Sequence, residues 1–338
     1  MRTIDWVDGA IELIDQTELP AQVSVRRITE LDELISDIQR LAVRGAPALG
    51  VAGALGVALI AHTDGDRASR LADAARLREA RPTAVNLSWG VDRVLTALDD
   101  GPDAVLAEAL RVRDEDIAAC VSMGLSGADL VRDLVPDRPR VRVATICNTG
   151  ALCAVERGTA LGVVQTLLEQ DSLEEVLPVE TRPLLQGARL TAWELKQMKA
   201  PFRLMVDSAA PYLLSRGLVD VVLVGADRIA ANGDTANKVG TFSLALAARQ
   251  AGIPFVVVAP ESTIDTGTLS GANIEIEDRG PGEVIQVAGT PTTPTGTDAI
   301  NPAFDVTPAE FITAIVTERR VVRLGNDGVA TGSGLLTA

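Results

Sequence analysis

The sequence predicts an α/β protein in which a small, mainly helical N-terminal domain precedes a Rossmann-like, doubly wound parallel-sheet domain. Two observations support this fold class. The first half carries apolar residues at three- and four-residue spacing, which is typical of helices, and the second half alternates short β-branched runs with helical segments. The turn-rich segment Pro136–Pro139 separates the two patterns, so we expect domains at 1–135 and 140–338.

The N-terminal part shows one short strand and then a series of helices. The strand lies at Ile11–Ile14, and a capping-box-like start follows at Thr29. Periodic apolar positions place helices at 45–61, 84–98 and 103–133. The first of these runs contains four glycines and is shorter than the ~20 residues that span a bilayer, so we expect a buried helix and no membrane partner.

The second domain shows strands and helices in alternation. The predicted strands are 141–146, 175–179, 203–206, 219–224 and 254–259, and the predicted helices lie near 150–169, 189–199, 207–215 and 235–251. Such alternation predicts a parallel, doubly wound sheet. Ligands of such sheets bind beyond the carboxyl ends of the strands, so functional residues are expected to follow strands.

Composition limits the partners and the compartment. The chain has 31 Lys+Arg against 46 Asp+Glu, and its formal charge of −15 would repel the phosphates of a nucleic acid, so we expect no nucleic-acid partner. Three cysteines without a CxxC pair, and no targeting segment at the N-terminus, indicate a reducing, cytoplasmic compartment. The single histidine, His62, has no second ligand at metal-binding spacing, so we expect it to be structural and expect no metal site.

A cysteine follows the first predicted strand of the second domain. Cys147 comes directly after the run 141–146 and opens an Asn-Thr-Gly turn before a predicted helix. Backbone N–H groups at a helix start stabilise a thiolate, which makes Cys147 a candidate for acid–base chemistry. Position alone also fits a small buried core residue, since most free cysteines are of that kind.

An aspartate occupies the matching place after another predicted strand. Asp227 follows the almost wholly apolar run 219–226, so we expect dry surroundings to raise the pKa of its carboxyl and to allow proton exchange near pH 7. A helix cap or an ion pair with Arg228 explains its position equally well. Nearby Asp234 is assigned to the turn and N-cap of the helix at 235–251.

Several segments place cationic side chains where an anion could bind. Arg44 stands beside Gly45 at one helix start, and Arg81 precedes another helix. Lys238, beside Asn237, is expected in the first turn of its helix, where a cation is unfavourable unless an anion is bound. A solvated or interface side chain explains each arginine taken singly. No GxGxxG follows a strand and no Walker lysine loop is present, so we expect no nucleotide cofactor.

Long blocks of sequence between about residues 11 and 318 carry a family resemblance. They include RGAPALGVAGALG at 44–56, RPTAVNLSW at 81–89, CNTGAL at 147–152, ETRPLLQGARLTAWEL at 180–195, VGADRIAANGDTANKVGT at 224–241 and NPAFDVTP at 301–308. Together they resemble the family that comprises the methylthioribose-1-phosphate isomerases and the regulatory subunits of translation factor eIF2B.

The resemblance implies a set of site residues. It implies that Cys147 and Asp227 are the catalytic pair and that no cofactor is needed. It implies a homodimer that binds a sugar phosphate through Arg44, Gly45, Ala46, Arg81, Gln186, Asn237 and Lys238. One departure is Ile146, which stands where the family usually has histidine, and we expect it to make that side of the pocket drier.

The activity implied by the resemblance is an aldose–ketose isomerisation in methionine salvage, from 5-methylthioribose 1-phosphate to 5-methylthioribulose 1-phosphate. Two alternatives stay open: isomerisation of 5-deoxyribose 1-phosphate or ribose 1,5-bisphosphate, and a non-catalytic regulatory subunit similar to those of eIF2B. With Arg44, Arg81 and Lys238 assigned to one phosphate, the sequence shows no second set of donors. An uncharged 5-substituent is therefore expected.

Overall fold

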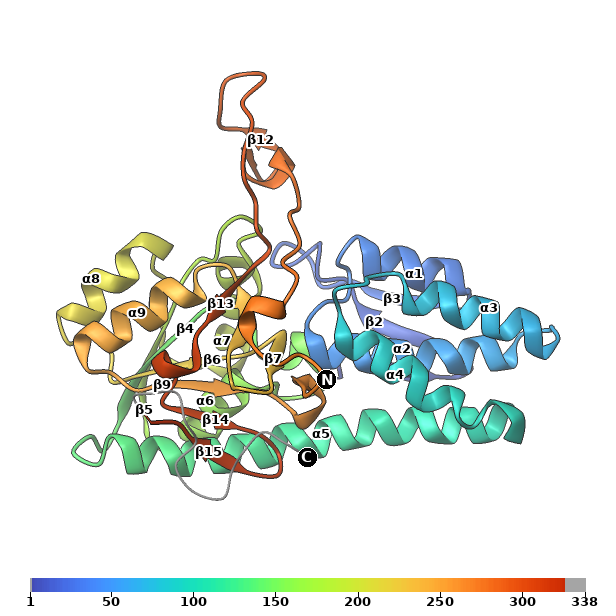
Figure 1. Cartoon of the computed structure of the whole chain (residues 1–338), viewed down its shortest axis with the longest axis horizontal. Helices are drawn as coiled ribbons and strands as arrows, with labels where there is room; N and C mark the ends of the chain where they lie inside the picture. The colour runs from blue at the N-terminus through green and yellow to red at the C-terminus, as the bar shows by residue number, and fades with distance from the viewer. Residues whose placement is uncertain (1, 326–338) are drawn as a thin grey trace.

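The computed structural model describes residues 2–325 and consists of a helical half and a sheet half that share one long helix (Figure 1). This helix, α5 (Pro102–Leu134), runs along both halves. Val105 and Ala109 in its first part belong to the N-terminal core, whereas Cys120 and Met123 further along belong to the core of the sheet half. Because α5 belongs to both cores, the division into domains at 1–135 and 140–338 stays a prediction.

The helical half begins with a small antiparallel sheet of which the sequence indicated only the middle strand. Its strands, in the order β1-β2-β3, are β1 (Ile4–Val7), β2 (Ala10–Ile14) and β3 (Val25–Ile28). The helices that follow are α1 (Leu31–Gln39), α2 (Ala46–His62), α3 (Arg67–Arg78) and α4 (Val85–Leu95).

Helix α2 is the centre of this half. Residues 47 to 61 of α2 are all buried, which confirms the expected buried helix. Its glycines allow α4 to pack closely, because a Cβ added to Gly90 of α4 would lie 2.0 Å from the carbonyl oxygen of Gly50. Among residues 2–325, no helix combines the length and hydropathy needed to cross a membrane. His62 ends α2, where its Nδ1 lies 2.8 Å from the carbonyl oxygen of Ala58.

The sheet half contains the predicted doubly wound sheet. Its order is β15-β14-β9-β6-β4-β5, and neighbours are parallel except for β14 and β15. Two parallel bridges from β5 to Phe202 and Met205 extend the sheet at the position of the predicted strand 203–206. The strands are β4 (Val141–Thr145), β5 (Leu173–Pro178), β6 (Val221–Val224), β9 (Phe255–Val258), β14 (Ala314–Val316) and β15 (Val321–Arg323).

Four helices accompany this sheet, and two of them begin later than expected. They are α6 (Ala160–Glu169), α7 (Ala192–Met198), α8 (Ala210–Ser215) and α9 (Thr241–Ala251). The prediction of a helix from residue 150 was wrong, because α6 begins only at Ala160. The prediction of a helix from residue 235 was also wrong, because residues 235–238 form a strand. Asp234 therefore does not cap α9, and its carboxylate instead accepts hydrogen bonds from the backbone N–H groups of Gly271 and Ala309, which begin two short 3-10 helices.

A second, four-stranded sheet lies beside the parallel one and was not predicted. Its order is β10-β7-β8-β13, formed by β10 (Ile264–Asp265), β7 (Arg228–Ala230), β8 (Thr235–Lys238) and β13 (Phe304–Thr307). Strand β13 pairs antiparallel with β8, so two segments almost seventy residues apart in the chain are neighbours. Strand β8 contacts Asp227, because its Ala236 accepts a hydrogen bond from the Asp227 N–H.

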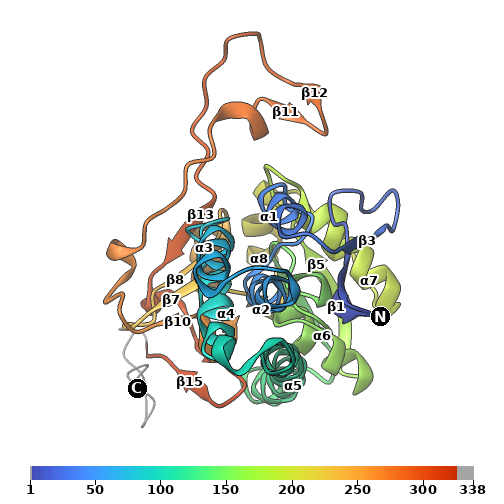
Figure 2. The same cartoon turned by 90° about the vertical axis from the view of Figure 1, so that its right-hand side faces the viewer.

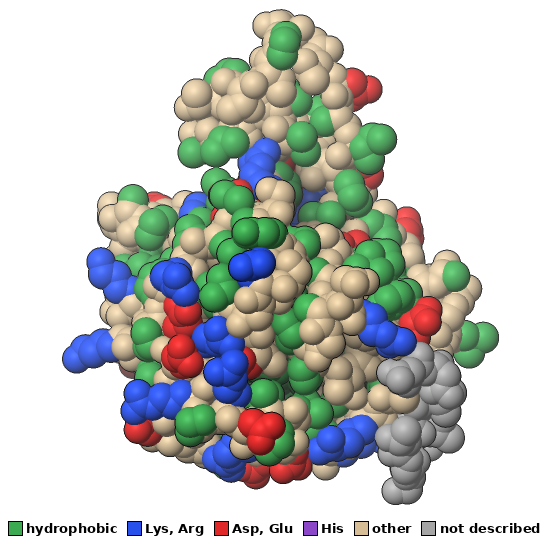
Figure 3. Space-filling model, turned by 90° about the vertical axis from the view of Figure 1, so that its left-hand side faces the viewer, with side chains coloured by type: hydrophobic (Ala, Val, Ile, Leu, Met, Phe, Trp, Pro, Cys, Tyr) green, Lys and Arg blue, Asp and Glu red, His purple; other side chains and the backbone are tan. Residues whose placement is uncertain are grey.

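An arm, defined as residues 279–301, projects from the body between the two halves (Figures 1 and 2). It carries the two-stranded sheet of β11 (Gln286–Val287) and β12 (Thr290–Pro291), and no residue from 281 to 300 is buried. Figure 3 shows the arm standing above the side that α8 and α9 cover, where apolar side chains gather on the surface. Among the exposed apolar residues, Tyr212 lies on α8 and Leu246 on α9.

Candidate active site

The two candidate catalytic residues lie at the ends of neighbouring strands. Cys147 follows β4 and Asp227 follows β6, and these strands pair directly through Val143 with Val221 and Ala144 with Val222. The chain passes from β4 to β5 on one side and later to β6 on the other, so the strand order reverses between β4 and β6. In open α/β sheets this switch point is where ligands bind.

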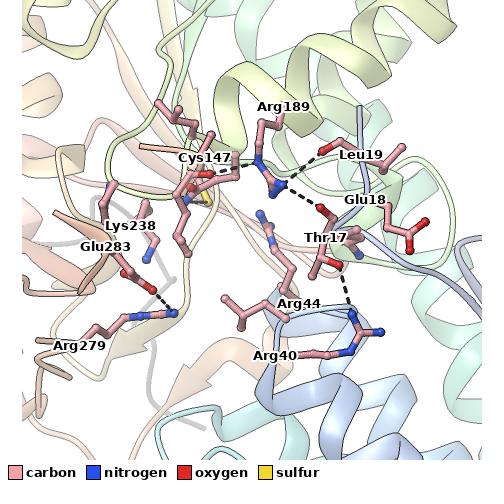
Figure 4. Close-up of a pocket in the computed structure, with 18 of the residues that line it drawn as sticks. Thr17, Glu18, Leu19, Arg40, Arg44, Cys147, Arg189, Lys238, Arg279 and Glu283 are labelled. Carbon is pink, nitrogen blue, oxygen red and sulfur yellow. Dashed lines mark hydrogen bonds and ion pairs between the residues drawn. The ribbon is translucent and has the colours of Figure 1, made fainter. Parts of the chain in front are cut away.

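A cavity of about 540 Å³ lies at this switch point (Figure 4). It has the size of a small-molecule site. Seven of the nine predicted site residues line it: Arg44, Gly45, Arg81, Cys147, Gln186, Asp227 and Lys238. The structure does not bring Ala46 or Asn237 to the cavity wall, so any role of these two in binding stays a prediction. No cluster of three or more His, Cys, Asp or Glu side chains suited to a metal ion occurs within residues 2–325.

Cys147 is held tightly from several sides. Its backbone lies in the left-handed region at φ 66°, which is uncommon for a residue with a side chain. Its N–H donates to Thr181 Oγ1 at 3.0 Å, and its carbonyl oxygen accepts from Thr191 Oγ1 at 2.6 Å. The side chain is 9% exposed, and its sulfur accepts a hydrogen bond from Gln186 Nε2 at 3.5 Å. The thiol therefore has a fixed position at the cavity wall.

The carboxylate of Asp227 has no hydrogen bond or ion pair with any side chain or backbone group that the structure describes. Only its backbone N–H is engaged, with the carbonyl oxygen of Ala236 at 2.9 Å. Burial raises the pKa of the Asp227 carboxyl, and the cations Lys238, Arg44 and Arg81 oppose that rise. Neither alternative explanation for Asp227 holds, because β7 rather than a helix follows it and Arg228 lies 3.6 Å from Asp265 instead.

Three predicted cations face the cavity without a carboxylate partner. Arg44 donates from Nη2 to the carbonyl oxygen of Asn148 at 2.8 Å, and Lys238 donates from Nζ to that of Ala303 at 2.6 Å. The guanidinium group of Arg81 forms no hydrogen bond or ion pair within the described residues. Burial lowers the pKa of both Arg81 and Lys238, and nearby cations add to the effect. The carboxylates of Glu277 and Asp227 act on Arg81 in the opposite direction without forming an ion pair with it. Partly buried cations that outnumber the nearby carboxylates favour the binding of an anion.

Lys238 ends strand β8 and does not lie in a helical first turn, which corrects the sequence interpretation. The backbone N–H groups at the start of α9 already have a hydrogen-bond partner within the protein. Asp305 accepts hydrogen bonds there from the N–H groups of Gly240 at 2.7 Å and Phe242 at 3.0 Å, and burial raises the pKa of its carboxyl to about 6. The Asn237 amide donates to Thr241 Oγ1 at 3.0 Å. The N-terminus of α9 is thus already occupied.

Three further arginines reach the cavity and were missed in the sequence: Arg40, Arg189 and Arg279. Arg40 is paired with Asp15 at 2.6 Å, and Arg279 is paired with Glu283 of the arm. Among the described residues, the Arg189 side chain donates only to main-chain carbonyl oxygens. Burial lowers the pKa of its guanidinium, and the nearby charge of Arg44 lowers it further. Figure 4 shows the guanidinium groups of Arg44 and Arg189 directed toward each other. Arg189 lies within the ETRPLLQGAR block, so the sequence did contain a signal for it.

Ile146 does not line this cavity, so the expectation that it dries the pocket beside Cys147 was wrong. Its side chain is 2% exposed and borders a second cavity of about 230 Å³, together with Val179, Gly240 and Leu244. The left-handed backbone of Cys147 turns the chain at this point, so the two neighbouring side chains border different cavities.

Fold and cavity together define a Rossmann-like α/β protein with a cation-rich site at the switch point of its sheet. The family model described as the Initiation factor 2 subunit family matches residues 42–323, which is most of the chain. The chain therefore belongs to the Initiation factor 2 subunit family.

Several known proteins are similar over nearly the whole chain. The methylthioribose-1-phosphate isomerase of Xanthomonas euvesicatoria pv. vesicatoria is 48% identical, over 95% of this chain and 92% of that protein. The 5-deoxyribose 1-phosphate isomerase of Moorella thermoacetica is 46% identical, over 95% and 93%. A Nocardia farcinica protein named as a probable bifunctional methylthioribose-1-phosphate isomerase/methylthioribulose-1-phosphate dehydratase is 53% identical, and this chain spans 60% of its length.

Solved structures give the same picture. The 5-methylthioribose 1-phosphate isomerase of Pyrococcus horikoshii OT3 superposes with a TM-score of 0.86 at 38% identity, covering 97% of this chain and 94% of that one. A structure described as translation initiation factor eIF-2B, subunit delta, from A. fulgidus superposes at 0.83 with 39% identity, covering 96% of each chain.

Proposed function

We propose that this protein is an aldose–ketose isomerase that converts 5-methylthioribose 1-phosphate into 5-methylthioribulose 1-phosphate, a step of methionine salvage. The observation that carries the proposal is the meeting of the Cys147 thiol and the unpaired Asp227 carboxylate in one cavity with unpaired cations. The names of the relatives from Xanthomonas and Pyrococcus point to the same activity.

The phosphate of the substrate is bound by the cations of the cavity in this proposal. Arg44, Arg81 and Lys238 supply charge and hydrogen-bond donors, and the phosphate relieves the repulsion between Arg44 and its neighbours. Gly45 begins α2 at φ 95°, and a Cβ there would lie 2.5 Å from Cys153 Cβ. Only glycine therefore lets the backbone approach the cavity at this helix start, where N–H groups favour an anion.

The chemistry assigns different tasks to the two catalytic residues. The anomeric oxygen of the substrate is esterified, so the ring cannot open to a free aldehyde without help. Asp227 protonates the ring oxygen as the bond between that oxygen and C1 breaks, and burial, which raises the pKa of its carboxyl, favours this role. Cys147 moves the C2 proton to C1 through an enol of the phosphorylated sugar, and the Asp227 carboxylate, which has given up its own proton, takes the proton of the C2 hydroxyl. These transfers leave a ketone at C2, a hydroxyl where the ring oxygen was and the phosphate still on C1.

A hydride shift from C2 to C1 is the competing mechanism, and solvent isotope incorporation separates the two. With the reaction run in deuterated water, proton transfer with exchange places deuterium at C1 of the product, which NMR detects. Complete retention of the substrate's C2 hydrogen at C1 supports the hydride shift. Either mechanism requires turnover, so measuring ketose formation from methylthioribose 1-phosphate by the purified protein is the first test of the proposed function.

A comparison of kcat/KM distinguishes the three candidate sugar-phosphate substrates. The wall of the cavity includes Leu41, Leu184, Leu185 and Phe304, which fits an uncharged 5-substituent such as methylthio or the methyl group of a 5-deoxy sugar. Arg189 is the one specific observation in favour of a second phosphate, because it carries charge without a carboxylate partner. We expect kcat/KM for methylthioribose 1-phosphate to exceed that for 5-deoxyribose 1-phosphate and for ribose 1,5-bisphosphate.

A non-catalytic regulatory role, similar to that of eIF2B subunits, is the second candidate function. The likeness to the A. fulgidus structure favours it, whereas the presence of both Cys147 and Asp227 at the cavity favours an enzyme. Absence of ketose product with correctly folded protein would favour the regulatory role. We further propose a cytoplasmic homodimer on the basis of the family resemblance, and the mass in solution from light scattering tests the dimer.

A further inference from the structure

The loop after β4 closes around a buried carboxylate that has no part in the mechanism above. Glu194 of α7 is 3% exposed, and its Oε1 accepts from Asn148 Nδ2 at 2.6 Å and from the N–H of Leu152 at 3.4 Å. The fit is tight at Gly150, where an added Cβ would lie 2.3 Å from Glu194 Oε2. The loop from 148 to 152 is therefore wrapped around one side chain.

A chain of hydrogen bonds connects this carboxylate to the backbone of Cys147. Asn148 directly follows Cys147, and its amide also lies 3.4 Å from Thr191 Oγ1, the group that donates to the Cys147 carbonyl oxygen. A non-glycine residue such as Cys147 is strained in the left-handed region and keeps that conformation only where its surroundings enforce it. The contacts of Glu194, Asn148 and Thr191 supply part of that enforcement.

We propose that Glu194 is a positioning residue that holds Cys147 in the backbone conformation which directs its thiol at the substrate. The inference rests on the proposed isomerase function for its kinetic consequences. Glu194 does not line the cavity, so it acts through the loop: its carboxylate binds Asn148 and the N–H of Leu152, and Asn148 in turn contacts Thr191. In its ionised form Glu194 accepts both hydrogen bonds of the loop, whereas a protonated carboxyl has weaker acceptors.

The charge state of Glu194 changes near neutral pH. Burial raises the pKa of its carboxyl to about 7, opposed by the hydrogen bonds from Asn148 and the loop N–H groups and by the charge of Arg44. The thiol of Cys153 is the other titratable group that faces it. Because the pKa of Glu194 is raised in the folded protein, its carboxylate is ionised above about pH 7 and becomes protonated as the pH falls through that value.

The substitution Glu194→Gln tests the proposal, because it keeps the shape and removes the charge. We expect kcat for methylthioribose 1-phosphate at pH 8.5 to fall by about tenfold or more, since small displacements of a reacting group are costly, with KM within about twofold. The ratio of wild-type to variant kcat should shrink toward one by about pH 6, where wild-type Glu194 is protonated too. Other titrating groups act in both proteins and cancel in this ratio.

Asp116→Asn is the matched control. Asp116 is a carboxyl on α5 whose pKa burial also raises to about 7, and it accepts from the N–H of Val155 at 3.0 Å, away from the cavity. Its ratio of wild-type to variant kcat should stay near one at every pH. A Glu194→Gln ratio that is near one, that does not change with pH, or that matches the loss of folded protein by circular dichroism overturns the proposal.

Two further measurements keep the test decisive. If Glu194→Gln does not fold, Thr191→Val removes only the hydroxyl that joins Asn148 to Cys147, and an unchanged kcat there contradicts the proposal. If the wild-type protein shows no turnover, the proposed function fails and alkylation of Cys147 by iodoacetamide decides this inference alone. The alkylation rate of wild type relative to Glu194→Gln should change through pH 7, and a constant ratio overturns the inference.

Discussion

Two strand ends face the same cavity and are built in opposite ways. After β4, Cys147 is fixed by residues of the segment that follows β5: its N–H donates to Thr181, and it accepts hydrogen bonds from Thr191 and Gln186. The turn after β6 leaves the Asp227 carboxylate without any partner among the described residues, and Arg81 near it is equally unpaired. The difference indicates that the thiol depends on exact placement, whereas the carboxylate side keeps charges available for the substrate and for proton exchange.

The largest expected effect comes from replacing the two central groups. Asp227→Asn and Cys147→Ser should each lower kcat by about 10²–10⁴-fold, the range of a lost acid–base group. Their stabilities should differ, because Asp227→Asn removes a partly desolvated charge and should raise the free energy of unfolding at pH 7, whereas Cys147→Ser should not. Kinetics with urea unfolding measures both. Near-normal turnover in both variants would falsify the catalytic assignment.

The next effect concerns substrate binding on the unpaired side. Arg81→Gln removes a charged donor to the phosphate, which is worth about 1.5–3 kcal/mol, so KM should rise by roughly 10–100-fold with little change in stability. Arg67→Gln is the control, because Arg67 is exposed and paired only with Asp99. If KM is unchanged in Arg81→Gln, the phosphate is bound elsewhere in the cavity.

A smaller effect tests the tightly held side. Thr181→Val removes the acceptor of the Cys147 N–H, and an unsatisfied buried group costs about 1–3 kcal/mol of stability. Thr307→Val is a matched control, because Thr307 is fully buried and its hydroxyl has no partner among the described residues. Urea denaturation should show a loss only for Thr181→Val, and equal losses in both variants contradict the contrast between the strand ends.

The smallest effect is a pH dependence. The folded pKa of Asp227 is raised above its ordinary value of 3.8, so the folded state holds this proton longer than the unfolded chain. Stability is therefore lost as the pH rises from about 4 through the folded pKa. When the pH is raised from 4.5 to 7.5, the urea midpoint of unfolding should fall more in the wild-type protein than in Asp227→Asn. Parallel changes in the two proteins would show that Asp227 titrates normally.

The sequence predicted the parallel sheet and both strand ends, because β6 and β9 are buried throughout and appear as continuous apolar runs, and β4 is buried apart from Arg142. It did not predict β8 and the delayed start of α9. Strand β8 is polar and pairs with β13, and Asp305 of that distant strand caps the helix. Contacts between such remote segments leave no local pattern.

The site residues that directly follow a strand could be predicted from the sequence. The site residues that reach the cavity from distant segments of the chain were harder to predict. Cys147 and Asp227 followed from their strands, whereas Arg40 and Arg279 reach the cavity from the first helix and the arm. Ile146 was misjudged because the left-handed turn at Cys147, which sends the two neighbouring side chains to different cavities, leaves no local sequence pattern. Arg189 was within a recognised block but was not singled out.

The arm has a consequence for how this enzyme family can diversify. Gln286, Ala288 and Gly289 of the arm border the cavity, yet no residue from 281 to 300 is buried. Exposed segments tolerate insertion and substitution far better than packed cores. One wall of the pocket can therefore acquire a new shape, and with it a preference for another sugar, through mutations that leave the folding of the sheet unaffected.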